Sequence, residues 1–474
     1  MPSIRPGVRR ELFWDEYLVN TSLTGAHLKQ HSPQIAEAVM EFDMPWEGDG
    51  CNYFSITSQD GIFRMYYLAW RMLADEEADG SPARIRVACI ESEDGLHWRR
   101  PQLQLRSYPG YGSTNILLDE TDGTFDNFHC FIDENPACPP DEKYKATSRC
   151  DSSGSLWCFT SPDGYHWKKA WPMSGKGTFD TQNVAFWSAE LGKYLCYIRS
   201  FHDVPGDDWN AGVRDIRCMT SEDFRSWSDP VLLDFGCSED IPLYTNAAFR
   251  YPDAPQMLVG MPSRYVERRE WTENFRQLTG AQERRRRMEF NPRYGLATTD
   301  CVLMTSRDGL HWKRGDEAWI DPGIERDRNW VYGDCYPAPG LIRTPSKLSG
   351  APEEYSLYTY EGHWSGKPAL LRRYTVRVDG FRSYRADRAP QMLVTKPILY
   401  EGGRLSLNFS TSARGYVYVS AKCGKEEIRS CELFGNSLSR IVPFDGDLSA
   451  FCGKEITLIF TMSDADLYSM QFVK

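Results

Sequence analysis

The sequence predicts an all-β protein, with a five-bladed β-propeller over residues 1–390 followed by a small β-sandwich over residues 391–474. Three observations support this fold class. A short turn motif recurs five times, strand-like runs lie on both sides of most copies, and the repeat stops near Ala386. Beyond that point, apolar and polar residues alternate to the C-terminus. Together these patterns indicate a repeat domain joined to a second, non-repeating β domain.

The turn motif reads Ser-x-Asp-Gly-x-His-Trp in its best copies. The five copies are Ser92–Trp98, Ser161–Trp167, Ser221–Trp227, Ser306–Trp312 and the degenerate Val378–Tyr384. An Asp-Gly pair between two apolar runs favours a tight turn, because Gly adopts positive φ and the Asp side chain bonds to the turn backbone. We therefore expect the motif to join the third and fourth strands of each blade.

The expected strands follow the same repeat. First strands are predicted at Cys51–Ile56, Phe128–Ile132, Val184–Trp187, Thr245–Phe249 and Tyr336–Ile342. Second strands are predicted at Phe63–Leu68, Tyr194–Ile198 and Tyr355–Tyr358. Third strands are predicted at Ile85–Ile90, Leu156–Phe159, Ile216–Met219, Cys301–Met304 and Tyr374–Arg377. In the C-terminal domain, strands are predicted at Arg404–Phe409, Tyr416–Val419 and Ile456–Phe460.

The composition and the net charge limit the kinds of partner that the protein is expected to bind. The net charge of −11 argues against nucleic acid as a partner, because an acidic surface repels phosphate. The one basic run, Arg284 to Arg287, lies in a polar stretch. We expect it in a solvated loop or at a subunit contact, which leaves a homo-oligomer open. No run approaches the ~18 to 20 apolar residues that span a bilayer, so we expect no membrane association.

The cysteines and the N-terminal residues favour a cytoplasmic protein. The first residues lack the apolar core of a signal peptide. The chain has 14 Cys without a CxxC pair, which favours reduced thiols over a structural zinc site. We assign no residue to a metal and expect no cofactor, while an axial structural cation such as calcium remains open.

The motif resembles a known group of enzymes. It differs from the Asp-box of sialidases, Ser-x-Asp-x-Gly-x-Thr-Trp, because Gly here follows Asp directly. It is more similar to the five-bladed propeller glycosidases, which include glycoside hydrolase families 32, 43, 68 and 130. A propeller followed by a sandwich resembles family 32 in particular. The segments Phe179–Trp187, Thr305–Gly309 and Arg372–Phe381 resemble uncharacterised bacterial proteins described as glycosidases of this superfamily.

The resemblance to family 32 is incomplete. The chain lacks the Trp-Asn-Asp-Pro-Asn-Gly segment expected near the start of those enzymes, and no Arg-Asp-Pro or Glu-Cys signature follows. The resemblance therefore does not imply specificity for fructans.

Carboxylates precede every predicted first strand. They are Glu47, Asp49, Asp126, Asp180, Glu239, Asp240 and Asp334. Because the first strands of a propeller converge on its axis, these groups are expected in one funnel. Such an arrangement suits glycosidic cleavage, which usually needs one carboxylic acid and one carboxylate. Crowding of carboxylates also raises their pKa values, which helps to keep an acid protonated.

The resemblance also implies roles for the catalytic candidates. By the order of blades in the superfamily, Glu47 or Asp49 is the base or nucleophile. Asp126 then orients the sugar and tunes the acid. Asp180 is the acid, with Glu239 as the alternative, although many relatives use Glu at this position.

Further residues are expected to bind the substrate. They are Asp49, Gln182, Asn183, Arg214, Tyr244, Asn246, Arg264, Asp334 and Trp364. Packing or a surface salt bridge is the alternative role for each of them. The leading hypothesis is a glycoside hydrolase that acts on an oligo- or polysaccharide. The alternatives are a glycoside phosphorylase, whose phosphate pocket Arg199, Arg214 and Arg264 would form, and a non-catalytic carbohydrate-binding propeller.

Overall fold

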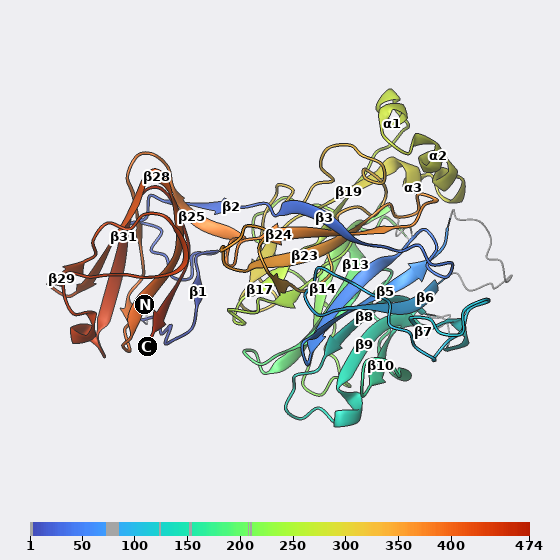
Figure 1. Cartoon of the computed structure of the whole chain (residues 1–474), viewed down its shortest axis with the longest axis horizontal. Helices are drawn as coiled ribbons and strands as arrows, with labels where there is room; N and C mark the ends of the chain where they lie inside the picture. Colours follow the sequence, from blue (N-terminus) through green and yellow to red (C-terminus); the bar gives the residue numbers. More distant parts are fainter. Residues whose placement is uncertain (1–2, 73–84, 123–124, 151–153, 207, 209–210) are drawn as a thin grey trace.

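A computed structural model of the chain describes residues 3–72, 85–122, 125–150, 154–206, 208 and 211–474. Five four-stranded sheets are arranged around one axis, and a separate C-terminal β domain lies beside them (Figure 1). The predicted fold class is therefore confirmed. None of the helices in these ranges is long and apolar enough to cross a bilayer. All 14 cysteines are described, and the structure pairs none of them in a disulfide.

Blades I to IV follow one another along the chain. Blade I contains β4 (Asn52–Gln59), β5 (Ile62–Trp70), β6 (Ile85–Ser92) and β7 (Ile116–Leu118). Blade II contains β8 (Phe125–Ile132), β9 (Tyr144–Cys150), β10 (Ser155–Ser161) and β11 (Lys168–Ser174). Blade III contains β12 (Val184–Ser188), β13 (Lys193–His202), β14 (Val213–Ser221) and β15 (Val231–Leu232). Blade IV contains β16 (Phe249–Arg250), β17 (Leu258–Gly260), β20 (Met304–Ser306) and β21 (Lys313–Arg314).

Blade V is completed by a strand from the other end of the propeller sequence. It contains β22 (Ile342–Thr344), β23 (Glu354–Glu361), β24 (Leu370–Val376) and the N-terminal β3 (Gln34–Glu41). Strand β3 pairs antiparallel with β24, and the buried Arg373 of β24 bonds Glu37 of β3. The ring is thus closed by backbone hydrogen bonds between residues more than 300 positions apart.

The prediction for the fifth turn motif was therefore wrong. Val378–Tyr384 does not join two strands of blade V, because it leads out of the propeller into β25 (Arg382–Ala386). Its Asp379 is fully buried and accepts hydrogen bonds from Tyr251, Asn408 and Ser469. A residue expected in a blade turn instead links the propeller to the C-terminal domain.

The other four motifs join the third and fourth strands, as predicted. In the first copy, Ser92 Oγ accepts the Gly95 amide at 2.8 Å, and Asp94 Oδ1 accepts the amides of Leu96 and His97 at 2.8 Å. The left-handed Gly95, with φ of 73°, lets its carbonyl accept the hydroxyl of Tyr358 in blade V at 2.6 Å. The motif therefore holds neighbouring blades together as well as turning the chain.

Two of the predicted first strands are shorter and later than expected. Regular pairing starts only at Phe249 in blade IV and at Ile342 in blade V. The backbone before them contains Ala247 and Cys335 in the left-handed region, with φ of 40° and 58°. Such residues interrupt an extended strand.

Blade IV carries an insertion that the sequence did not predict. Strands β18 (Ser263–Glu267) and β19 (Ala297–Cys301) form a two-stranded sheet. Between them lie α1 (Glu273–Gln277), α2 (Ala281–Phe290) and α3 (Arg293–Leu296), which stand together above the blades in Figure 1. The basic run lies in α2, and its Arg284 and Arg287 are fully buried. The expectation of a solvated loop was wrong for these two residues.

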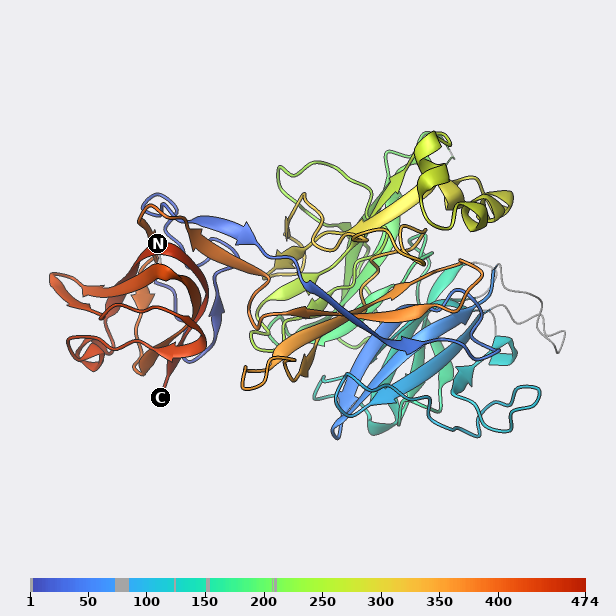
Figure 2. The same cartoon turned by 45° about the horizontal axis from the view of Figure 1, so that its top comes forward.

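The C-terminal domain is built on two long strands, β28 (Arg404–Cys423) and β31 (Glu455–Val473). The register between β28 and β31 shifts between Thr411 and Tyr416. Both strands extend along the whole domain, and the sheet curls around one hydrophobic core (Figure 2). The shorter partners are β1 (Glu11–Leu12), β2 (His27–Gln30), β25, β26 (Gln391–Val394), β27 (Ile398–Leu399), β29 (Glu426–Arg429) and β30 (Asn436–Ile441). Two predicted strands, 404–409 and 416–419, are thus parts of one.

At both ends of the propeller sequence, the strands do not join the sheets that the predicted domain boundaries assign to them. Strand β1 pairs with β31, and β2 pairs with β25, so residues before 31 belong to the C-terminal sheet. Strand β25 also joins that sheet, although it precedes residue 391. Short 3-10 helices complete the secondary structure at Glu120–Asp122, Pro140–Glu142 and Leu448–Phe451.

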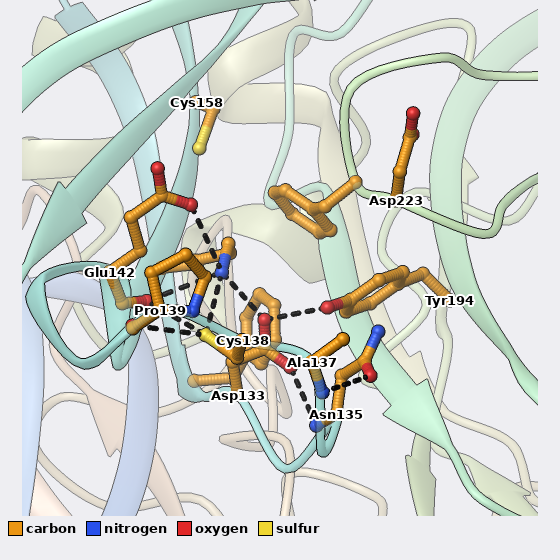
Figure 3. A network of polar contacts seen from close by, with 12 residues as sticks. Asp133, Asn135, Ala137, Cys138, Pro139, Glu142, Cys158, Tyr194 and Asp223 are labelled. Carbon is orange, nitrogen blue, oxygen red and sulfur yellow. Dashed lines mark hydrogen bonds and ion pairs between the residues drawn. The ribbon is translucent and has the colours of Figure 1, made fainter.

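A buried polar network fastens blade II to blade III. Lys145 Nζ of β9 lies 2.6 Å from Asp133 Oδ2, and the hydroxyl of Tyr194 in β13 donates to the same oxygen at 2.7 Å. Figure 3 shows Tyr194 reaching Asp133 across the two blades. The Lys145 and Asp133 side chains are 2% and 0% exposed, so the buried Asp133 depends on Lys145 for compensation, while Lys145 also has Glu142 at 3.6 Å.

Removing one charge of this pair should destabilise the fold strongly. We expect Lys145→Met to lower the free energy of unfolding by about 3–5 kcal/mol, because it leaves Asp133 buried without its cation. The matched control is Lys168→Met, since Lys168 pairs with Asp141 on the surface, where both side chains are more than 60% exposed. That change should cost less than about 1 kcal/mol in urea unfolding. Equal losses in the two variants would contradict the role of the network.

The turn motifs should make stability depend on acid pH. Although partial burial opposes the shift, hydrogen bonds from the turn backbone lower the pKa of Asp163 and of Asp308 to about 2. Their contribution is present above the unfolded pKa of about 3.9 and is lost as the pH falls from about 4 to about 2. Measured by urea unfolding across this pH range, the free energy of unfolding should fall less steeply in an Asp163→Asn/Asp308→Asn variant than in the parent. Parallel pH profiles would refute this origin.

Candidate active site at the propeller axis

The inner strands of the blades begin with a repeated backbone distortion. Tyr53, Asn127, Ala247 and Cys335 have φ between 40° and 58°, which is the left-handed region. In blade III the equivalent distortion falls at Phe179, with φ of 50°. Non-glycine residues in this region cost of order 1–3 kcal/mol and persist where the surroundings enforce them. The five segments therefore enter the axis with a constrained geometry.

Hydrogen bonds between blades enforce this geometry. The amide of Gln182 donates to the carbonyls of Tyr53 and Phe54 in blade I, at 2.8 and 2.9 Å. Asn127 Nδ2 donates to the Phe179 carbonyl at 2.8 Å. Asn246 Nδ2 donates to the Gln182 carbonyl at 3.2 Å. These amide side chains hold the inner strands of four blades at fixed positions around the axis.

A cavity of about 40 Å³ lies where these segments meet. Its walls come from all five blades and from the insertion. The lining residues are Asn52, Tyr53, Trp70, Asp126, Asp180, Tyr244, Arg293, Tyr294, Tyr332, Tyr336, His363 and Trp364. Aromatic rings dominate this set, and Trp364 stacks on Tyr332 with an interplanar angle of 7°. We call this cavity the axial pocket.

Two carboxylates of the axial pocket face one guanidinium group. Asp126 Oδ2 and Asp180 Oδ1 lie 3.9 and 3.8 Å from the same nitrogen of Arg149. Asp180 also pairs at 3.0 Å with Arg199, whose side chain is only 5% exposed. The two acids therefore come from different blades but share one electrostatic environment.

The two acids differ in their surroundings. Burial raises the pKa of the Asp126 carboxyl to about 7, and the charge of Asp180 adds to this shift. Asp180 is 44% exposed and has the direct pairing with Arg199. At neutral pH the site thus combines one carboxyl that carries a proton in a large fraction of molecules with one guanidinium-paired carboxylate.

Part of the pocket wall carries uncharged polar atoms. The Tyr336 hydroxyl, His363 Nδ1 and Trp364 Nε1 are buried and have no hydrogen-bond partner within the described part of the chain. Burial, and then the charge of Arg287, lowers the pKa of His363 well below its usual value, so its ring is neutral. Buried polar groups normally have partners. A ligand with several hydroxyl groups would supply them.

Only some of the sequence-predicted residues reach the axial pocket. Asp126, Asp180, Tyr244 and Trp364 line it. Glu239 does not line it and is exposed to solvent. The remaining predicted residues have other contacts, which account for their positions.

Glu47 and Asp49 hold loops of blades I and V. The Glu47 carboxylate is fully buried, where it accepts the Tyr67 hydroxyl at 2.6 Å and pairs with Arg100 at 2.8 Å. Asp49 accepts the backbone amides of Met72 and Gly366 at 2.7 and 3.1 Å. The structure does not bring either carboxylate to the lining of the axial pocket, so the blade-one base expected from the sequence is not found there.

The predicted sugar-binding amides and arginines mostly connect parts of the fold. Asn183 Nδ2 bonds the Phe179 and Thr181 carbonyls, and Gln182 and Asn246 crosslink blades as described above. Arg214 lies over the Tyr265 ring at 4.2 Å, and Arg264 pairs with Asp300. Asp334 is buried behind the pocket, where its Oδ2 accepts the Val331 amide and burial raises the pKa of its carboxyl to about 7.

Several lining residues were not predicted. Tyr336 opens a predicted first strand, and Tyr53 lies inside one, so their place in the repeat was a usable signal. Arg293 and Tyr294 belong to the insertion, which has no counterpart in the other blades and therefore no repeat position. Arg149 is the second-last residue of β9, and nothing in its local sequence marks it as a partner of two distant acids.

One group of metal-ligating side chains lies off the axis. Within the described ranges, His202, Asp203 and Asp240 place one ligand atom each within 4.8 Å of one another. His202 already contacts Asp215 at 3.2 Å and Asp240 at 2.8 Å through its two ring nitrogens. Although burial opposes it, these hydrogen bonds raise the pKa of His202. The group is therefore satisfied as an ion-paired histidine.

Comparison with known proteins gives similarity in structure only. No protein-family model and no curated protein sequence matches the chain. An N-acetylgalactosamine deacetylase from F. plautii, solved with blood group B trisaccharide, is 13% identical with a TM-score of 0.44, over 73% of this chain and 94% of that chain. A thermostable family-43 glycoside hydrolase is 12% identical with a TM-score of 0.41, over 71% and 90%. The Bombyx mori family-32 β-fructofuranosidase is 8% identical with a TM-score of 0.40, over 94% of each chain.

The titration of Asp126 should depend on Asp180. We expect the Asp126 carboxyl to titrate near pH 7 and to shift to lower pH in Asp180→Asn, because the neighbouring negative charge is removed. Carboxyl-carbon NMR of selectively labelled protein measures both values. Asp163, whose pKa is about 2, serves as an internal control in the same spectra. A normal Asp126 titration in the parent protein would exclude the described electrostatics.

Proposed function

We propose that the chain is a glycosidase that cleaves an oligo- or polysaccharide in the axial pocket. One observation carries the proposal: Asp126 and Asp180 face the same Arg149 nitrogen from different blades, and burial raises the pKa of Asp126 to about 7. Glycosidic cleavage usually needs such a pair, with one acid protonated and one carboxylate ionised. Two carboxyl groups in different environments, one with a raised pKa and one paired with cations, are typical of acid and base roles.

The proposed roles follow from the surroundings of each acid. Asp126 donates a proton to the leaving glycosidic oxygen, because burial favours its neutral form. Asp180 acts as the base or nucleophile, and Arg199 keeps its carboxylate oriented. This order exchanges the roles that the resemblance implied, in which Asp180 was the acid and Asp126 an orienting residue. Glu47 and Glu239 have no part in it.

The uncharged wall supports a carbohydrate as the ligand. Tyr336, His363 and Trp364 offer free donors and acceptors without a charge. Sugar hydroxyls both donate and accept hydrogen bonds, so they match such groups. The stacked rings of Tyr332 and Trp364 add apolar surface beside them. An aromatic wall with a few polar groups is typical of small-ligand sites.

The insertion must move before a sugar can bind. The free volume of about 40 Å³ is far below the ~300 Å³ at which ligand pockets begin. Arg293 and Tyr294 come from α3 and narrow the pocket on the insertion side. We infer that a substrate displaces this segment and leaves the five blades in place.

Substitution of the two acids tests the proposal. We expect Asp126→Asn and Asp180→Asn each to lower kcat by about 10²–10⁴-fold, as is usual for loss of a general acid or base. Turnover is measured on a panel of aryl glycosides and natural oligosaccharides. Glu239→Gln is the matched control and should retain full activity, because its side chain is exposed and outside the pocket. Full activity in both Asp variants would remove them from the mechanism.

A glycoside phosphorylase is the second candidate. Phosphorolysis needs a phosphate site beside the acid, and Arg149, Arg199 and Arg293 lie in or beside the axial pocket. Turnover that requires inorganic phosphate and releases a sugar phosphate would select this reaction over hydrolysis. Tight sugar binding by calorimetry without any turnover would favour a non-catalytic binding propeller.

A further inference from the structure

The basic run of the sequence places two arginines in the interior. Arg284 and Arg287 lie three residues apart on α2, so they share one face of the helix. Both are 0% exposed. Among the described residues, no carboxylate lies within salt-bridge distance of either guanidinium group. Burial lowers the pKa of each guanidinium to about 10.

Backbone carbonyls satisfy most of these guanidinium groups. Arg287 Nη1 donates to the Trp364 carbonyl at 2.9 Å, and its Nε donates to the Tyr294 carbonyl at 3.2 Å. Arg287 Nη2 is buried and has no partner in the described part of the chain. Carbonyl oxygens orient a guanidinium, but they do not neutralise its charge. The carboxylates of Asp334, Asp49 and Glu283 act on Arg287 from beyond ion-pair distance. Within the described part of the chain, the buried Nη2 therefore has no direct partner, which is costly.

A small cavity lies against Arg287. Its volume is about 20 Å³, which is enough for a single water molecule or a single atomic ion. Thr279 and Gly280 form one side, so the cavity lies at the N-terminal end of the ten-residue helix α2. Gly280 is the N-cap and provides no side-chain acceptor to the first amides of the helix. A helix end of this kind attracts anions.

The other charges around the cavity partly cancel. Lys367 pairs with Asp327 at 2.8 Å, and Arg328 pairs with Glu41 at 2.8 Å. Glu283 also lines the cavity and lies one helical turn before Arg287. No ion pair forms between Glu283 and Arg287, although their spacing would permit one. The carboxylate of Glu283 would therefore repel a bound anion and compete with it for Arg287.

We propose that this cavity binds a small inorganic monovalent anion of the size of chloride, held by Arg287 Nη2 at the N-terminus of α2. The anion compensates a buried guanidinium charge and meets the uncapped end of the helix. A volume of about 20 Å³ suits a single atomic ion. The proposal is independent of the reaction proposed for the axial pocket.

The anion site would also stiffen the axial pocket. Arg287 holds the backbone of Trp364 and of Tyr294, and both residues line that pocket. An anion on Nη2 fixes the guanidinium and, through it, both wall segments. Occupancy of the site would therefore be linked to the mobility of the insertion.

Bromide provides the direct test, because it scatters anomalously and is close to chloride in size. Crystals of the unmodified protein are soaked in sodium bromide, and an anomalous peak is expected within contact distance of Arg287 Nη2. Water in the cavity, or a Glu283 carboxylate turned onto Arg287, would overturn the proposal. This measurement needs no variant and does not depend on catalysis.

Thermal unfolding provides the second test. At constant ionic strength, exchange of sodium gluconate for sodium chloride should raise Tm by about 1 °C per tenfold increase in chloride above half-saturation. Glu283→Gln should bind chloride more tightly, so its Tm should respond at lower chloride, because the competing charge is gone. Arg287→Lys should lose the response, and Arg285→Gln, on the exposed side of α2, should keep it. A Tm in the parent that is insensitive to chloride, with Glu283→Gln merely less stable, would assign Glu283 as the counter-ion.

Discussion

The closure of the ring by β3 is the constraint on which the rest of the propeller depends. Strand β3 pairs with β24 and completes blade V with residues from the start of the chain. Because the ring is closed, the inner strands of all five blades must meet at one axis. The left-handed residues at their beginnings and the amide crosslinks between blades then fix where each inner segment turns. Asp126 and Asp180 reach one pocket because their segments in blades II and III are held together at this axis.

Burial and neighbouring cations give the carboxyl groups of Asp126 and Asp180 different electrostatic environments. Asp126 lies deeper and loses solvation of its charged form, whereas Asp180 is more exposed and pairs with Arg199. Arg149 contacts both and limits their mutual repulsion. The same balance of burial and charge appears in the insertion, where Arg284 and Arg287 are buried against carbonyl groups. In both places, burying a charge is costly. We propose that a proton on Asp126 and an anion beside Arg287 offset this cost.

Sequence reasoning predicted the architecture because the turn motif has a direct physical basis. Its Asp and Gly residues form the same turn in blades I, II and IV, and Phe224 takes the left-handed position of Gly in blade III, with φ of 62°. The closing strand β3 was not predicted, because Gln34–Glu41 carries no copy of the motif. The fifth motif was misleading because the buried contacts of Asp379 replace the blade turn.

The candidate site was predicted in part for a similar reason. Asp126 and Asp180 were found because their positions before inner strands follow from the repeat. Glu47 has the same kind of position, but its partner Arg100 is 53 residues away, and no local pattern reveals that pair. Arg284 and Arg287 were misjudged because a polar stretch resembles a solvated loop until the fold buries one face of it. Contacts between distant residues are what the sequence did not reveal.

A crystal structure of Asp126→Asn with a bound oligosaccharide tests the central claim most directly. The account predicts a sugar in the axial pocket, with its glycosidic oxygen within hydrogen-bond distance of residue 126 and its anomeric carbon facing Asp180. It also predicts that Arg293 and Tyr294 are displaced while the blades stay in place. A sugar bound outside the pocket, with Asp126 and Asp180 untouched, would contradict the account.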